Sequence, residues 1–70
     1  MIDMGPSSYR RQRIVEFAQR LIWRKEHLRQ QLTEEVFADQ VEQIKGQMQA
    51  LDTVIRELIS EFDISTDEFR

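Results

Sequence analysis

Apolar side chains recur along the second half of the chain in alternating steps of four and three residues. The eight positions of this stripe are Phe37, Val41, Ile44, Met48, Leu51, Ile55, Leu58 and Phe62. On an α-helix this spacing keeps the side chains on one narrow face, which is the seam against which another helix packs. The pattern therefore predicts an amphipathic helix over about residues 34–62 whose apolar face needs a partner.

The first half of the chain predicts another helix, with a wider apolar face. The hydroxyl of Ser7 or Ser8 can cap a helix that runs over about residues 9–31, and we expect residues 1–8 to form a disordered lead. The apolar residues of this helix spread over an arc of roughly 160°, which indicates contact with more than one neighbouring helix. These residues are Ile14, Val15, Phe17, Ala18, Leu21, Ile22, Leu28 and Leu32.

A change of phase separates the two predicted helices. On one continuous helix the apolar stripe would rotate by roughly 110° between the two halves, so we expect a tight turn near residues 30–33. Thr33 is a good N-cap for the second helix, and the carboxylates of Glu34 and Glu35 suit the positive end of its dipole. One continuous helix is the alternative, because neither glycine nor proline interrupts residues 7–45.

These elements predict an all-α fold, an antiparallel two-helix hairpin that dimerises into a four-helix bundle. Charge supports this arrangement, because residues 1–32 carry a net charge of +4 and residues 33–70 a net charge of −7. The two halves therefore attract each other within a hairpin or between antiparallel chains. A chain of 70 residues has a small core, so association is the expected source of further stability. The predicted core and dimer seam combines the stripe of the second helix with Ile14, Phe17, Leu21 and Leu28.

The last residues carry the start signal of one more helical turn. Ser65 and Glu68 have the spacing of a capping box, and Ile64 and Phe69 have that of a hydrophobic staple. Residues 63–70 are too few for a long helix. We expect them to form either one capped turn packed on the hairpin or a mobile tail.

The sequence contains few residues that suit catalysis or metal binding. The chain has no cysteine, and its single histidine, His27, falls on the outer face of the first helix, roughly opposite the apolar arc. Glu35, Asp39 and Glu42 form an acidic stripe, but one helix face supplies too few oxygens for a hard cation. We therefore predict no catalytic, cofactor-binding or metal-binding residues and no small-molecule substrate, and we expect that the protein is not an enzyme.

A stripe of arginine and aromatic residues follows the outer face of the first helix. These residue types carry much of the binding energy at protein interfaces, so the stripe predicts a partner-binding surface. Its predicted members are Tyr9, Arg13, Arg20, Trp23, Arg24 and His27. Two other interpretations stay open: a solvated charged face, or a nucleic-acid surface on which arginines contact phosphates and an aromatic ring stacks on bases. The acidic second half of the chain opposes the nucleic-acid interpretation.

The sequence favours a non-enzymatic interaction module, a small adaptor, regulator or chaperone that forms a homodimer and binds a larger protein. One alternative is a dimeric nucleic-acid-binding hairpin. Another is an obligate small subunit or inhibitor that folds on a larger partner. No basic start is followed by an apolar stretch, and apolar runs such as Leu21-Ile22-Trp23 are too short to span a membrane. We therefore expect a cytoplasmic protein without membrane association.

Overall fold

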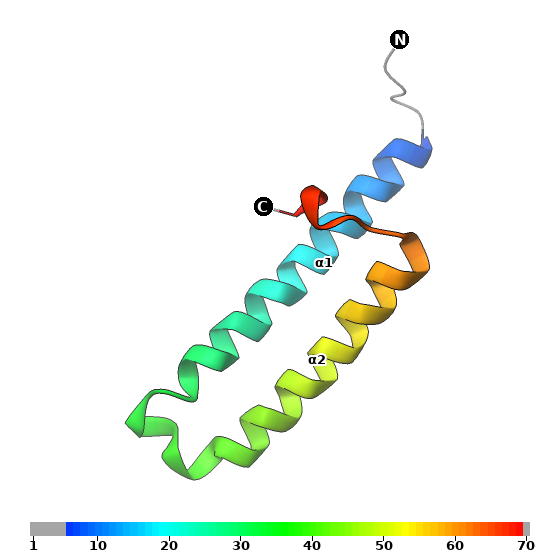
Figure 1. Cartoon of the computed structure of the whole chain (residues 1–70). Helices are drawn as coiled ribbons and strands as arrows, with labels where there is room; N and C mark the ends of the chain where they lie inside the picture. Colours follow the sequence, from blue (N-terminus) through cyan, green and yellow to red (C-terminus); the bar gives the residue numbers. More distant parts are fainter. Residues whose placement is uncertain (1–5, 70) are drawn as a thin grey trace.

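A computed structural model of the chain describes residues 6–69. Two long helices, α1 (Pro6–Gln31) and α2 (Val41–Phe62), run antiparallel and pack against each other (Figure 1). Two short 3-10 helices complete the fold, η1 (Glu35–Gln40) in the link between them and η2 (Thr66–Glu68) after α2. No strand occurs in this described part of the chain, so the predicted all-α helical hairpin is confirmed.

Helix α1 begins three residues earlier than the sequence predicts. Its first residue is Pro6, whose fixed φ and missing N–H suit the first helical position. The backbone of residues 6–8 is helical, which corrects the predicted lead at these positions, whereas residues 1–5 lie outside the described part. The helix ends at Gln31, where the sequence predicts its end.

The link between the helices differs from the prediction. The Thr33 hydroxyl does not cap the second helix, because it donates a hydrogen bond of 2.7 Å to the carbonyl of Gln30 at the end of α1. Glu34 then precedes η1 without a side-chain capping bond. Without a cap, the first free N–H groups are satisfied by tight 3-10 bonds, such as that from Phe37 N–H to the Glu34 carbonyl at 3.1 Å. The α-helix expected from residue 34 therefore begins only at Val41.

The core of the hairpin is small. Its buried apolar side chains are Ala18, Leu21, Ile44, Ile55 and Ile64, of which the predicted seam contains only Leu21, Ile44 and Ile55. The half-buried seam residues are Ile14, Leu28, Phe37, Val41, Met48, Leu51 and Leu58.

Two residues of the predicted core and dimer seam are exposed in the single chain, which corrects their place in the hairpin core and leaves the dimer seam a prediction. Phe17 is 44% exposed because Ala18, one position further on, is the residue that faces α2. Phe62 is 39% exposed because it is the last residue of α2, where the seam ends.

A lysine interrupts the apolar line along which α1 meets α2. The positions of this line follow steps of four and three and are Ile14, Ala18, Leu21, Lys25, Leu28 and Leu32. The Lys25 Nζ atom lies 2.7 Å from Asp52 Oδ1 on α2, and Arg56 Nε lies 2.9 Å from Asp52 Oδ2. A polar residue in an apolar seam favours one register of the two helices. If α1 shifted along α2, Lys25 would lie among apolar side chains without Asp52.

Helix α2 ends at a residue in the left-handed conformation. Asp63 has φ 50° and ψ 51°, which aspartate adopts more readily than most residues. The N–H groups of Asp63 and Ile64 both bond to the carbonyl of Ile59, so the chain reverses sharply and buries Ile64. We call residues 63–69 the C-terminal turn.

The C-terminal turn contains the predicted capping box. Ser65 Oγ accepts a hydrogen bond of 3.3 Å from Asp67 N–H, and Glu68 Oε2 accepts one of 2.8 Å from Ser65 N–H. Figure 1 shows the turn lying across α1. Of the two predicted states, the structure has the packed, capped turn.

The C-terminal turn covers part of one side of the hairpin, and the other side is open. Phe17 precedes the buried Ala18 in α1 and is 44% exposed, and Val54 precedes the buried Ile55 in α2 and is 43% exposed. Gln19 and Arg56 are the residues that follow Ala18 and Ile55. Each successive residue is rotated by about 100° around the helix axis. In an antiparallel pair, the residues that precede seam positions therefore lie on one side of the hairpin, here Phe17 and Val54. The residues that follow seam positions lie on the other side, here Gln19 and Arg56. Gln19 is only 7% exposed, and it lines the same groove as Glu68 of the C-terminal turn. We call that side the closed flank and the side of Phe17 and Val54 the open flank.

Candidate functional site

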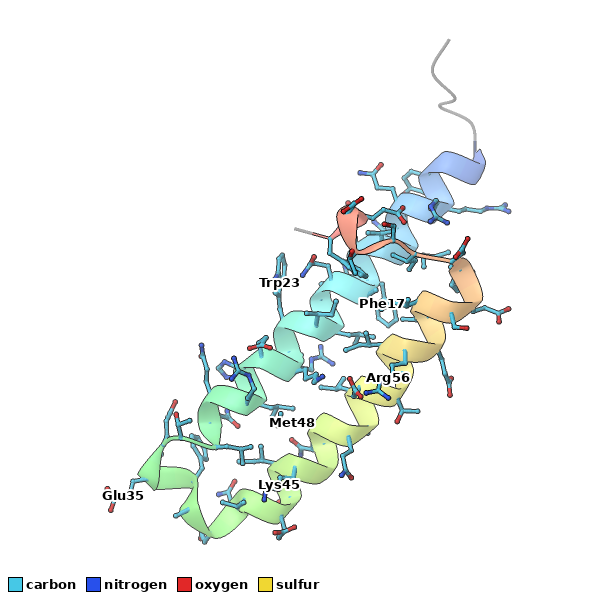
Figure 2. The ribbon with its side chains drawn as sticks, in the orientation of Figure 1. Phe17, Trp23, Glu35, Lys45, Met48 and Arg56 are labelled. Carbon is cyan, nitrogen blue, oxygen red and sulfur yellow. The ribbon has the colours of Figure 1, made fainter. Side chains whose placement is uncertain are left out.

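The predicted partner-binding residues lie on α1 and are all exposed. Tyr9 is 62% exposed and Trp23 is 57% exposed, and Figure 2 shows Trp23 pointing away from α2. The other four, which are Arg13, Arg20, Arg24 and His27, are exposed as well. The structure therefore places these side chains on an accessible helix face.

An open groove of about 620 Å³ runs along α1 beside the C-terminal turn. We call it the α1 groove. Its lining residues are Arg11, Gln12, Val15, Glu16, Gln19, Arg20, Trp23 and Glu68. Val15 supplies an apolar wall, Trp23 supplies an aromatic ring, and the remaining lining groups are polar or charged. Such a mixture suits a peptide or helix that brings both an apolar and a polar side chain.

Arg11 builds the groove by holding the C-terminal turn against α1. Its Nε donates to Glu68 Oε1 at 2.9 Å, and its Nη2 donates to Glu68 Oε2 at 2.7 Å. The same guanidinium donates to the carbonyls of Phe62 at 2.8 Å and Asp63 at 3.0 Å. It thus satisfies carbonyls that the end of α2 leaves without helical partners and adds a two-pronged bond to a carboxylate. We call this set of bonds the Arg11 clamp.

The clamp also changes the acidity of Glu68. The hydrogen bond from Arg11 and then the bond from the Ser65 N–H favour the charged carboxylate, so the pKa of Glu68 lies below its usual value. The same hydrogen bond raises the pKa of Arg11. At neutral pH both groups of the clamp are charged.

The α1 groove unites only part of the predicted surface. Arg20 and Trp23 line it, whereas Tyr9, Arg13, Arg24 and His27 do not. Sequence reasoning missed Arg11 as a site residue, because no spacing rule connects it with a carboxylate 57 positions away. The capping box predicted an ordered turn that contains Glu68 as one of two alternatives, the other being a mobile tail.

The arginines of α1 divide into paired and unpaired groups. Arg11 and Arg29 form ion pairs with Glu68 and Glu26, each at 2.7 Å. Over residues 9–69 no ion pair involves Arg10, Arg13, Arg20 or Arg24. Arg20 instead places its guanidinium carbon 5.7 Å from the centre of the Phe17 ring. These four cations are therefore available to an external partner.

Residues 6–69 contain neither a candidate metal site nor a helix that could span a membrane. No group of three or more histidine, cysteine, aspartate or glutamate residues there has the arrangement of a metal site. None of the helices in that part of the chain has the length and apolar character that crossing a membrane requires. Comparison of the chain with protein-family models, with curated proteins and with solved structures gave no match.

Proposed function

We propose that this chain is a non-enzymatic interaction module, a small cytoplasmic adaptor, regulator or chaperone. In this proposal it forms a homodimeric four-helix bundle and binds a larger protein through the outer face of α1. The observation that carries the proposal is the contrast between a core of five buried apolar side chains and large apolar side chains that stay exposed. In this proposal, helix packing stabilises the chain and also mediates its binding to other proteins.

The exposed apolar surface supports association. Among the described residues, Tyr9, Trp23 and Val36 are 62%, 57% and 73% exposed. In a two-helix hairpin each helix packs against only one other helix. The face of each helix that points away from this neighbour therefore stays in contact with water. Covering part of that surface with another helix lowers the free energy of the folded chain.

The outer face of α1 is the proposed site for a larger protein. Trp23 stands at one end of the α1 groove, with Arg20 beside it and Val15 in the wall. Tryptophan and arginine are enriched among the residues that dominate binding energy at interfaces. A partner helix with an apolar anchor for Val15 and Trp23 fits this surface.

Replacing Trp23 tests the protein-binding proposal. We expect Trp23→Ala to lose capture of partner proteins from a cell extract by the immobilised chain, while the circular dichroism of the helices stays unchanged. Val36→Ala is the control, because it shortens an exposed apolar side chain in η1, away from the outer face of α1. Unchanged capture by Trp23→Ala contradicts the proposal, and loss of helicity makes Trp23 a structural residue.

A nucleic-acid-binding dimer is the second candidate function. The observation that favours it is the set of α1 arginines without ion pairs over residues 9–69, together with the exposed rings of Tyr9 and Trp23. Fluorescence anisotropy with labelled RNA hairpins and DNA duplexes at low salt tests it, because phosphate contacts are strongest there. Absence of binding under those conditions removes this candidate.

A further inference from the structure

We propose that a second copy of this chain covers the open flank, with α1 of each copy antiparallel to α2 of the other. The two-fold axis of this dimer runs parallel to the helices. The inference rests on the self-association in the proposed function and names the surface that mediates it.

The open flank carries apolar side chains that the hairpin itself does not cover. Phe17 is 44% exposed and Val54 is 43% exposed, and Leu58 is half-buried. Arg11 contacts Asp63 and Lys25 contacts Asp52 across the hairpin, so this register places Phe17 level with Leu58. The three side chains therefore form one patch that spans both helices.

The closed flank is not available to a second copy in the same way. There the C-terminal turn already lies on α1, fastened by the Arg11 clamp, and Gln19 is only 7% exposed. A second copy that avoids the C-terminal turn thus packs on the open flank.

Charge selects the orientation of the second copy. A rotation about an axis parallel to the helices leaves every residue at its own height, so α1 meets α2 of the second copy in the register of the hairpin itself. In that register Arg13 stands level with Glu61, and Arg20 stands level with Glu57. Each copy then places two arginines against two glutamates of the other.

The opposite orientation is unfavourable. A two-fold axis across the helices sets α1 against α1 and brings the arginines of the two copies together. Within residues 9–69 none of Arg13, Arg20, Glu57 and Glu61 forms an ion pair, so all four charges are available for the favourable arrangement.

A charge-swap experiment on the full chain tests the interface. The two variants are Arg13→Glu/Arg20→Glu and Glu57→Arg/Glu61→Arg, and sedimentation equilibrium at low salt measures their dimer dissociation constants. We expect each variant alone to dimerise at least tenfold more weakly than the wild type, because all its cross-copy pairs become repulsive. A one-to-one mixture of the two variants restores dimerisation, since both interfaces then regain opposite charges.

Two further variants keep the result interpretable. Arg29→Glu/Arg56→Glu makes the same charge change away from the open flank and is expected to leave the dissociation constant within about threefold of the wild type, since distant charges are screened. Phe17→Ala removes the apolar centre of the patch and is expected to weaken dimerisation without lowering helicity.

The possible outcomes separate the interface from the proposed function. A wild-type dimer that neither swap weakens overturns the open-flank interface and leaves self-association standing. A wild type that is monomeric over a hundredfold range of concentration overturns both. Capture of a larger protein that depends on Trp23 is measured in Glu57→Arg/Glu61→Arg, because that variant leaves every predicted partner-binding residue of α1 in place.

Discussion

The two flanks of the hairpin bury their apolar side chains to different degrees, although the same two helices form both. On the closed flank the C-terminal turn buries Ile64 to 6% exposure and Gln19 to 7%. On the open flank Phe17 and Val54 keep more than two fifths of their surface in water. The difference arises from seven residues after α2 and one arginine that fastens them. The chain covers part of one flank with its own C-terminal turn and leaves the other flank exposed.

The largest expected effect is on the seam that both flanks share. Ile55→Ala removes a side chain that is 6% exposed, and we expect it to lower the free energy of unfolding by about 2–5 kcal/mol. Leu51→Ala is the control, because Leu51 is only half-buried and should lose less. Urea unfolding followed by circular dichroism measures both. Equal losses of unfolding free energy in the two variants would contradict the deeper burial of Ile55.

The next effect compares the two flanks directly. We expect Ile64→Ala to destabilise the dilute monomer by about 2 kcal/mol, the lower end of the range for buried isoleucine, because the turn can detach. Phe17→Ala should cost the dilute monomer less than half of that, since Phe17 is 44% exposed. Urea unfolding at a concentration at which sedimentation shows a monomer gives both values. A larger loss for Phe17→Ala would reverse the assignment of open and closed flanks.

A smaller effect is expected from the capping box on the closed flank. Ser65→Ala removes the oxygen that accepts from Asp67 N–H, and loss of an N-cap costs about 0.5–2 kcal/mol. Thr66→Ala is the control, because it changes the adjacent residue of the same turn and keeps the Ser65 hydroxyl. Amide hydrogen exchange of Ile64 reports the local opening. Identical exchange in the two variants would mean that the Ser65 hydroxyl does not stabilise the turn.

The smallest effect is the pH dependence of the closed flank. The folded pKa of Glu68 is lowered, so its contribution is present at neutral pH and is lost as the pH falls through that folded pKa. We expect the C-terminal turn to loosen in acid while the α-helices remain. Nuclear magnetic resonance of the Ile64 and Phe69 amides follows this step.

Glu68→Gln is the control for the acid response. Asp52 and Glu26 also have lowered pKa values, because Lys25 and Arg29 bond to them, so a global signal mixes several groups. The local amide signals separate them. If the amides of Glu68→Gln shift with pH as in the wild type, the response belongs to another carboxylate.

The regular parts of the fold were predictable because local spacing determines them. The steps of four and three in α2 define one face, and the change of phase before it requires a reversal of the chain. The capping box was predictable for the same reason, since Ser65 and Glu68 lie three residues apart and contact each other directly. These features need no knowledge of distant residues.

The missed features depend on contacts between distant residues or on competition between local bonds. Lys25 breaks an apolar line, and only Asp52 on the other helix explains why it is tolerated there. Thr33 fits two roles by sequence, and its bond to Gln30 selects the one that the cap rule does not favour. Phe17 belongs to a wide apolar arc, and the helix rotation that puts Ala18 in the seam is a property of the packed pair.

The candidate site was predicted in outline only. Exposed Arg20 and Trp23 follow from their place on the polar face of α1, but a groove beside them requires a second wall. That wall is the C-terminal turn, and its attachment depends on the Arg11 clamp rather than on periodicity. A search for arginines near a capping-box glutamate in an assumed hairpin would have found it.

The Arg11 clamp also bears on the order in which the chain assembles. Arg11 and Glu68 are 57 residues apart in sequence, so their bond closes a long loop at the end of the hairpin remote from the link. The entropy cost of closing a loop grows with its length, and a hairpin lowers that cost by zipping from its link outward. We expect the clamp to form last and to open first. We therefore expect the free end of the hairpin to unfold locally at a lower free energy than the whole chain, so that the apolar surface beneath the turn meets solvent without global unfolding.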